Sequence, residues 1–188
     1  MYVTDDMISR MVDRYGCPHL RDFRFEVPQR EVDRIRSSQK NGRNHDVTLY
    51  IRKDNQLVVI AKHFYPPGLY RAPSGGLHPG EDFETGISRE VSEETGCSIT
   101  LDKFLMQTSV TFCNDHDSVF WRSFVFLADY QSGDFQHTDK DEIREVRTCD
   151  WSEFESFGRI MRAMDIGGLR YRAALHETVA ELLSERTS

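Results

Sequence analysis

The sequence lacks the features that mark several large classes of protein. Its four cysteines lie far apart, with no CxxC pair and no cysteine–histidine cluster at the spacing of a zinc site. No apolar run approaches the length of a membrane span, and the first residues carry two acids where a signal peptide carries basic residues. We therefore expect a cytoplasmic protein with idle or buried thiols and no membrane partner.

Positive charge is also in short supply. The chain has 24 Lys and Arg against 31 Asp and Glu, a formal net charge of -7. No broad basic field is available to gather nucleic acid non-specifically, so nucleic acid is not an expected partner. The composition is otherwise that of a globular protein, with 38% hydrophobic residues, and 188 residues suit one core with an appended segment.

The first part of the chain has two helical patterns. Residues 4–15 place apolar side chains at helical spacing behind a capping Thr4, and a thinner pattern covers residues 29–40. These patterns predict an N-terminal helical extension over residues 1–43.

The pattern then changes to that of a mixed sheet with helices, which predicts an α/β domain over residues 44–188. Residues 46–64 alternate as two strands joined by a turn, and the Pro- and Gly-rich residues 65–76 predict a loop or a broken edge strand. The remaining predicted elements are a helix over 82–95, strands within 98–112, 118–130 and 142–151, and helices over 152–164 and 171–185.

One stretch of the predicted domain, SGGLHPGEDFETGISREVSEETG, is unusual in its charges. On a helix, Glu90, Glu93 and Glu94 share one edge, where like charges lower helix stability. Carboxylates without imidazole or thiolate suit a hard cation such as Mg²⁺ or Mn²⁺, which is commonly shared with phosphate oxygens. The preceding Gly75 and Gly76 would let the backbone approach such a metal or a diphosphate closely.

This stretch resembles the Nudix box, the signature of the MutT-like Nudix hydrolases. The matching positions are Gly75, Glu81, Arg89, Glu90, Val91, Glu93, Glu94 and Gly96; only Cys97 departs, where the family usually has an aliphatic residue. The resemblance implies a Nudix-type α/β/α sandwich with a mixed sheet. It also implies Mg²⁺- or Mn²⁺-dependent hydrolysis of the diphosphate bond in a nucleoside diphosphate linked to another group.

The resemblance also implies roles for individual residues. Glu90 and Glu94 would be the principal metal ligands, Glu93 a further ligand or the general base, and the Gly75 carbonyl a backbone ligand. Arg89 would position the glutamates by ion pairing, and Glu81 would brace the loop or join the metal shell.

Four residues outside the box are further candidates. Glu142 and Glu145 could supply a general base from a neighbouring strand, or could be exposed strand charges. Tyr70 and Arg71 could stack on a base and pair with phosphate, or could form an ordinary edge-strand pair. With Gly76, Tyr70 and Arg71 make up the predicted substrate contacts.

The substrate class stays open on sequence grounds. ADP-ribose-like compounds, nucleotide sugars and nucleoside triphosphates all fit, and the SQPWPFPxS stretch of NADH pyrophosphatases is absent. A catalytically silent nucleotide sensor, an isomerase on the same fold and an RNA 5′-end pyrophosphohydrolase are the alternatives. The apolar stripe within residues 173–183 could pack in the core or form a homodimer contact.

Overall fold

The computed structural model describes residues 2–39 and 42–184, which fold around one seven-stranded mixed sheet. The helices are α1 (Asp5–Tyr15), α2 (Gln29–Ser38), α3 (Phe83–Thr95), α4 (Glu153–Ala163) and α5 (Gly167–Ser184). The strands are β1 (His19–Glu26), β2 (His45–Lys53), β3 (Gln56–Lys62), β4 (Ser74–Gly75), β5 (Cys97–Cys113), β6 (Ser118–Gly133) and β7 (Ile143–Cys149). Lys40 and Glu185, the last residues of two predicted helices, lie outside the described residues.

The sheet combines parallel and antiparallel pairs in the order β1-β5-β6-β2-β3-β7, with the short β4 pairing with β2. Hairpins join β2 to β3 and β5 to β6, while β1 runs parallel to β5 and β2 parallel to β6. This mixed sheet confirms the predicted α/β class. Among the described residues, no helix is both long and apolar enough to cross a membrane.

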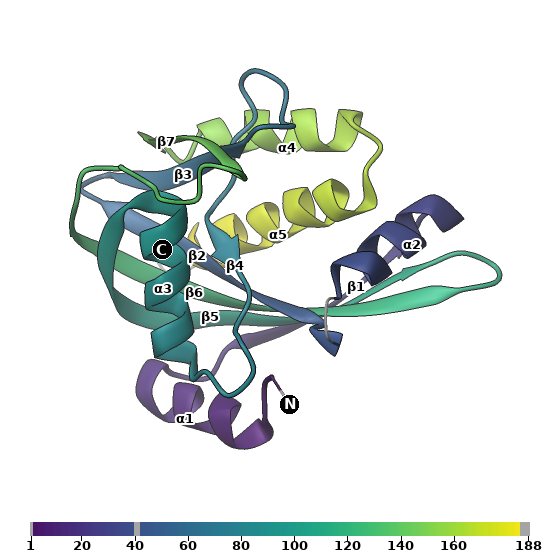
Figure 1. Ribbon diagram of the computed structural model, residues 1–188, viewed down its shortest axis with the longest axis horizontal. Helices are drawn as coiled ribbons and strands as arrows, with labels where there is room; N and C mark the ends of the chain where they lie inside the picture. The colour runs from purple at the N-terminus through teal and green to yellow at the C-terminus, as the bar shows by residue number, and fades with distance from the viewer. Residues whose placement is uncertain (1, 40–41, 185–188) are drawn as a thin grey trace.

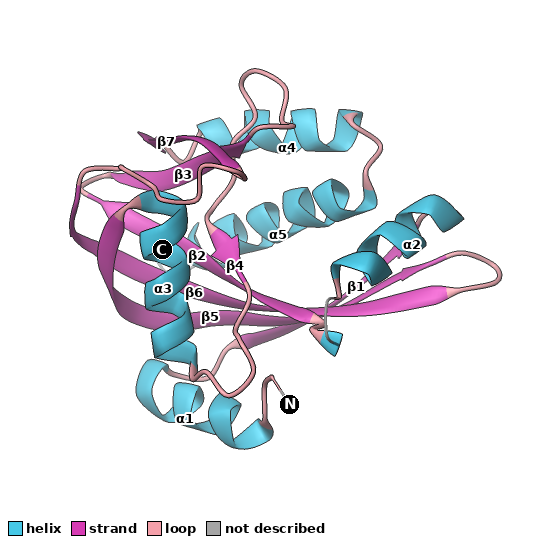
Figure 2. Cartoon of the chain, in the orientation of Figure 1, coloured by secondary structure: helices cyan, strands magenta, loops and turns pink. Residues whose placement is uncertain are grey.

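Helices cover both faces of the sheet, as Figures 1 and 2 show. One apolar cluster joins a face of the sheet to residues of α2, α4 and α5, and the other joins the opposite face to α1 and α3. The C-terminal stripe belongs to the first cluster, since Ala173, Leu175, Val179 and Leu182 are all buried there. The apolar side of α3 therefore packs on the sheet, and its acidic edge faces the loop that precedes the helix.

The strand β1 is an element that the sequence patterns did not predict. It lies within residues 1–43 and pairs with β5 from His19, opposite Met106, to Glu26, opposite Cys113. Its Phe23 and Phe25 alternate toward the core, where both rings lie near that of Tyr171. The N-terminal segment is therefore a structural part of the sheet as well as a pair of helices.

A buried histidine links α5 to the sheet. The Nδ1 atom of His176 lies 2.5 Å from the hydroxyl oxygen of Tyr50 on β2, and both side chains are buried. Burial lowers the pKa of His176 from its ordinary 6.5 to about 3. His45 is also buried, and burial lowers its pKa to about 4. Both imidazoles are therefore neutral in the folded protein near neutral pH.

Because these two pKa values are lowered, we expect the free energy of unfolding to decrease in mild acid. As the pH falls below about 6.5, the unfolded chain binds protons that the folded chain accepts only near the depressed pKa values. For His176 alone, the free energy of unfolding should fall by up to about 1.4 kcal/mol per pH unit between pH 6.5 and 3. Urea unfolding at a series of pH values measures this slope.

The variant His176→Asn keeps an acceptor for Tyr50 but does not titrate, so its stability should fall less steeply in that pH range. The matched control is His116→Asn, because His116 is exposed in the turn between β5 and β6. The control should keep the wild-type slope. An identical slope in all three proteins would contradict the assignment.

Candidate functional site

The acidic edge lies on α3, whose ends are set by local sequence. Asp82 caps the N-terminus by accepting a 2.9 Å hydrogen bond from the Thr85 backbone N–H, and Gly96 ends the helix in the left-handed conformation. Phe83, Ile87 and Val91 are buried against the sheet. These contacts fix the position of α3, and therefore of its glutamates, relative to β4.

The Arg89 guanidinium binds the loop and the helix together. It donates two hydrogen bonds of 2.9 Å to the two carboxylate oxygens of Glu81 and one of 3.0 Å to the Gly76 carbonyl. It also donates to Glu90 at 2.9 Å and to Glu93 at 3.1 Å. One cation thus offsets three carboxylates, through the planar set of donors that arginine provides.

The two glycines let the loop backbone lie directly against this network. The Gly76 N–H donates a 3.1 Å hydrogen bond to Oε1 of Glu90. A Cβ at Gly75 would overlap the Glu90 carboxylate, and one at Gly76 would overlap the Arg43 guanidinium. Close approach, rather than a positive φ, therefore accounts for these glycines, because a larger residue would displace Glu90 or Arg43.

Glu94 is held by a different group of residues. Its side chain is 5% exposed, Oε2 accepts a 2.8 Å hydrogen bond from the Ser74 backbone N–H, and Oε1 lies 3.6 Å from the guanidinium of the buried Arg71. Arg71 also donates to the Ser74 hydroxyl and to the Ala72 carbonyl. The structure therefore places Arg71 inside the protein as a neighbour of Glu94, with a second arginine, besides Arg89, near the acidic edge.

These surroundings give the carboxyl groups different affinities for protons. Hydrogen bonds from Arg89 hold the pKa of Glu81 down at about 2. Burial raises the pKa of Glu94 to about 7, against the opposing charge of Arg71. The positive charge of the protein near Glu94 does not offset the cost of burying its carboxylate.

The residues on this edge fit a hard divalent cation in their chemistry. The carboxylates of Glu90, Glu93 and Glu94 and the carbonyl of Gly75 all offer oxygen ligands. A bound cation would also add the positive charge that the surroundings of Glu94 do not fully provide. In the described part of the chain, no three acidic, His or Cys side chains already form a metal-binding group. Glu90 and Glu93 instead share Arg89, and Glu94 accepts from Ser74, so binding a cation would require side-chain rotation.

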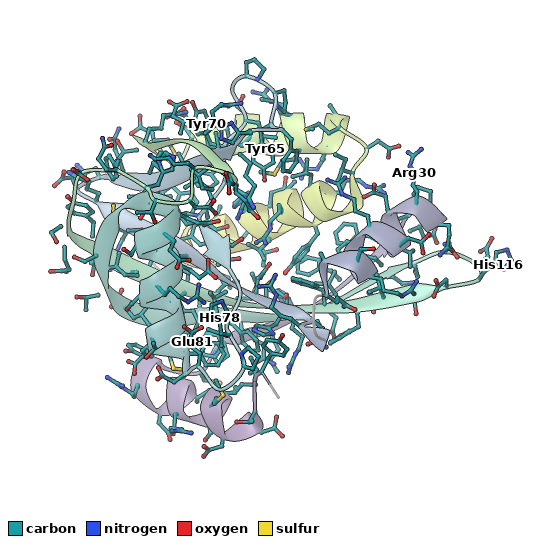
Figure 3. All side chains as sticks on the ribbon, viewed as in Figure 1. Arg30, Tyr65, Tyr70, His78, Glu81 and His116 are labelled. Atoms are coloured by element: carbon teal, nitrogen blue, oxygen red, sulfur yellow. The ribbon has the colours of Figure 1, made fainter. Side chains whose placement is uncertain are left out.

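The candidates outside the box lie on β7, immediately before β7, and in the loop before β4. The Tyr70 hydroxyl donates a 2.7 Å hydrogen bond to Oε2 of Glu145, and the Arg147 guanidinium lies 4.1 Å from the centre of the Tyr70 ring. Glu142 pairs with Lys62 of β3. In the view of Figure 3, Tyr70 is well separated from His78 and Glu81, which lie in the loop before α3.

Arg172 and its partners Ser74, Thr48 and Asp46 lie near this edge but were missed by sequence reasoning. Arg172 of α5 donates 3.0 Å and 2.7 Å hydrogen bonds to the hydroxyls of Ser74 and Thr48, and it pairs with the buried Asp46 of β2. Ser74 thus connects Arg172, Arg71 and Glu94. In the sequence, Arg172 stands out as a charged residue between Tyr171 and Ala173. Its partners could not be predicted because they come from distant segments of the chain.

Comparison with known proteins relates this site to a family. The sequence model described as NUDIX domain matches residues 42–166. The NAD-capped RNA hydrolase NudC of Vibrio parahaemolyticus is 26% identical over 140 residues, which cover 74% of this chain and 48% of that protein. NudC of Haemophilus influenzae is 29% identical over 112 residues, covering 58% and 39%. The chain spans about half the length, or less, of these curated relatives.

A solved structure supports the fold. A NUDIX hydrolase from Nitrosomonas europaea is similar to this chain with a TM-score of 0.51 and 20% sequence identity, over 73% of this chain and 89% of that one.

The close fit of Gly75 against Glu90 yields a prediction. In Gly75→Ala the added Cβ displaces the Glu90 carboxylate from the Gly76 N–H, so the affinity for Mn²⁺ should fall by about 10–100-fold. Isothermal titration with Mn²⁺ measures the change. The control is Gly158→Ala in α4, where a Cβ makes only ordinary contacts and Mn²⁺ binding should be unchanged. Wild-type Mn²⁺ affinity in Gly75→Ala would contradict the prediction.

Proposed function

The chain belongs to the NUDIX family, and we propose that it hydrolyses the diphosphate bond of a nucleoside diphosphate linked to another group, with Mg²⁺ or Mn²⁺ as cofactor. The observation that carries the proposal is the Arg89 network. It orders Glu81, Glu90 and Glu93 around the Gly75–Gly76 backbone, beside the buried Glu94. A merely solvated acidic helix would not need this arrangement.

The proposed chemistry divides between the cation and the protein. When bound, Mg²⁺ or Mn²⁺ would neutralise the diphosphate and lower the pKa of a water molecule that attacks phosphorus. Glu90, Glu94 and the Gly75 carbonyl would hold the cation, and Glu93 would act either as a further ligand or as the general base. Arg89 keeps Glu90 and Glu93 oriented, and Glu81 keeps Arg89 in place with two parallel hydrogen bonds.

Two carboxylates are candidates for the general base. Glu93 has 47% of its side chain exposed and reaches solvent beside the metal-binding edge. Glu145 is also exposed, but one of its oxygens accepts the Tyr70 hydroxyl. We favour Glu93 because it lies on the same helix edge as the proposed ligands, and Glu145 is the alternative.

Turnover assays on a panel of nucleotides would identify the group that is linked to the nucleoside diphosphate. The curated relatives are NAD-capped RNA hydrolases, yet this chain lacks the SQPWPFPxS stretch and carries a net charge of -7. The panel therefore contains ADP-ribose, nucleotide sugars, dinucleoside polyphosphates, NADH, NAD-capped RNA and nucleoside triphosphates, each with and without Mg²⁺. Cation-dependent release of a nucleoside monophosphate, or of diphosphate from a triphosphate, is expected for at least one compound. Tight binding without turnover of any compound would instead favour the nucleotide-sensor alternative.

The variant Glu94→Gln tests the cofactor and the reaction together. It removes a buried proposed ligand while keeping the shape of the side chain, so turnover should fall by at least about 100-fold and Mn²⁺ binding should weaken. The control is Glu84→Gln on the same helix, because Glu84 instead pairs with Arg14 and Tyr15 of α1. Glu84→Gln should keep wild-type turnover. Equal turnover in Glu94→Gln and the wild type would remove Glu94 from the site.

A further inference from the structure

The strand β1 is the last strand on one side of the sheet. In the order β1-β5-β6-β2-β3-β7 it lies at the opposite end from β7, and in the described part of the chain it pairs with β5 alone. Figure 1 shows it below β5, at the margin of the sheet. It has eight residues, of which six are exposed, and Leu20 is 70% exposed. An edge strand of this length offers a row of unpaired backbone groups to another strand.

The hydrogen bonds at the end of β1 show which backbone groups face this free edge. The N–H and C=O of one strand residue point to the same side, and those of the next residue point to the other side. The Val27 N–H donates a 2.9 Å hydrogen bond to the Cys113 carbonyl of β5. The Glu26 carbonyl accepts a 3.0 Å hydrogen bond from Arg170 and therefore points away from β5. Every second residue before Glu26 has the same orientation, so the free edge also carries the backbone groups of Leu20, Asp22 and Arg24.

Two of these residues carry opposite charges and have no partners of their own. Asp22 and Arg24 are both exposed, and neither forms an ion pair or a side-chain hydrogen bond within residues 2–39 and 42–184. Charged side chains on an edge strand commonly prevent pairing with unrelated strands. Here the two opposite charges stand two residues apart on the same face of the strand, so the strand can match a second copy of itself.

A second copy of β1 fits this edge in one antiparallel register. When Phe23 lies opposite the Phe23 of the second copy, Asp22 of each copy lies opposite Arg24 of the other, and their outward backbone groups meet as hydrogen-bonded pairs. A shift by two residues places Asp22 opposite Asp22, or Arg24 opposite Arg24, and like charges directly opposite are destabilising. A shift by one residue would place outward backbone groups against inward ones.

The other face of β1 supports the same register. The rings of Phe23 and Phe25 are only partly buried, and their centres lie 6.3 Å apart. In this register the two Phe23 rings become neighbours across the interface. Arg21 of each copy lies opposite Phe25 of the other, where a cation–π contact can form. Pairing would therefore cover aromatic surface that a single chain leaves partly exposed.

We propose that β1 is a dimer interface, at which two copies of this chain pair their β1 strands antiparallel about a two-fold axis at Phe23. The sheet then continues from one copy into the other through a contact that uses the same patch on both, the commonest arrangement in soluble homodimers. The apolar stripe within residues 173–183 is not available for this purpose, because Ala173, Leu175, Val179 and Leu182 are buried within a single chain.

Two properties of the chain bear on this interface. The net charge of -7 on each copy opposes association at long range, but at about 0.15 M salt the screening length is about 8 Å, whereas Asp22 and Arg24 would be in direct contact. In the sheet, β1 is separated from β4 and its Gly75 by β5, β6 and β2. The dimer therefore does not depend on the proposed function, and either proposal can fail alone.

Exchange of the two charges tests the register. Analytical ultracentrifugation of the wild-type chain at about 100 μM should give a mass near twice 21.9 kDa. In Asp22→Arg and in Arg24→Asp each contact becomes a like-charge pair, so each variant alone should dimerise at least about tenfold more weakly. An equimolar mixture of the two variants should recover the wild-type association, because every contact then joins an arginine to an aspartate.

The matched control for Asp22→Arg is Asp141→Arg. Asp141 is exposed in the turn before β7, at the opposite end of the sheet, and its reversal changes the net charge equally. This control should dimerise like the wild type. A monomeric wild type at about 100 μM would overturn the inference, and so would a mixture of the two folded charge variants that stays monomeric.

Hydrogen exchange on the wild-type chain tests the interface even if a charge variant does not fold. The outward N–H groups of Leu20, Asp22 and Arg24 should be protected at about 100 μM and should lose that protection on dilution to about 1 μM. The N–H of Phe23 points toward β5, so its exchange should change much less. A dimer in which the protection of Asp22 and Arg24 is independent of concentration would use another surface and would overturn the inference.

Discussion

The side chain of Arg89 is the constraint on which the site depends. Its guanidinium contacts Glu81 and Gly76 in the loop and Glu90 and Glu93 on the helix, so one rigid group determines how the loop lies on α3. The glycines follow from this contact, because the backbone must pass where a Cβ would meet a side chain. Without Arg89, the carboxylates of Glu81, Glu90 and Glu93 would lose the cation that offsets their mutual repulsion.

The carboxylates at and beside the acidic edge form two groups that differ in exposure to solvent and in their partners. Glu81, Glu90 and Glu93 share Arg89 and reach toward solvent to different degrees. Glu94 faces the interior, where Ser74 and Arg71 are its neighbours. The Ser74 N–H donates to Glu94, and Arg172 of α5 donates to the Ser74 hydroxyl, so Ser74 links the helix α3 to α5.

Sequence patterns revealed the elements whose signals are local. The turn at Asp54, the helix α3 and its end at Gly96 follow from short-range periodicity and glycine placement. The strand β1 was missed because its alternating apolar pattern is limited to Phe23 and Phe25, in a segment that also carries the charged Arg21, Asp22, Arg24 and Glu26. Its partner, β5, is far away in the chain. The spacing of the glutamates revealed the candidate ligands, but no single sequence could show that Arg71 neighbours Glu94 or that Arg172 pairs with Asp46.

The parallel pairing of β1 with β5 also bears on how the protein forms during synthesis. The strand β1 hydrogen-bonds to residues 106–113, so it cannot pair until that later segment has left the ribosome. The amphipathic helices on either side of β1 must wait with it, because their apolar sides pack on a sheet that does not yet exist. Completion of this edge is therefore a late event, which brings together distant parts of the nascent polypeptide.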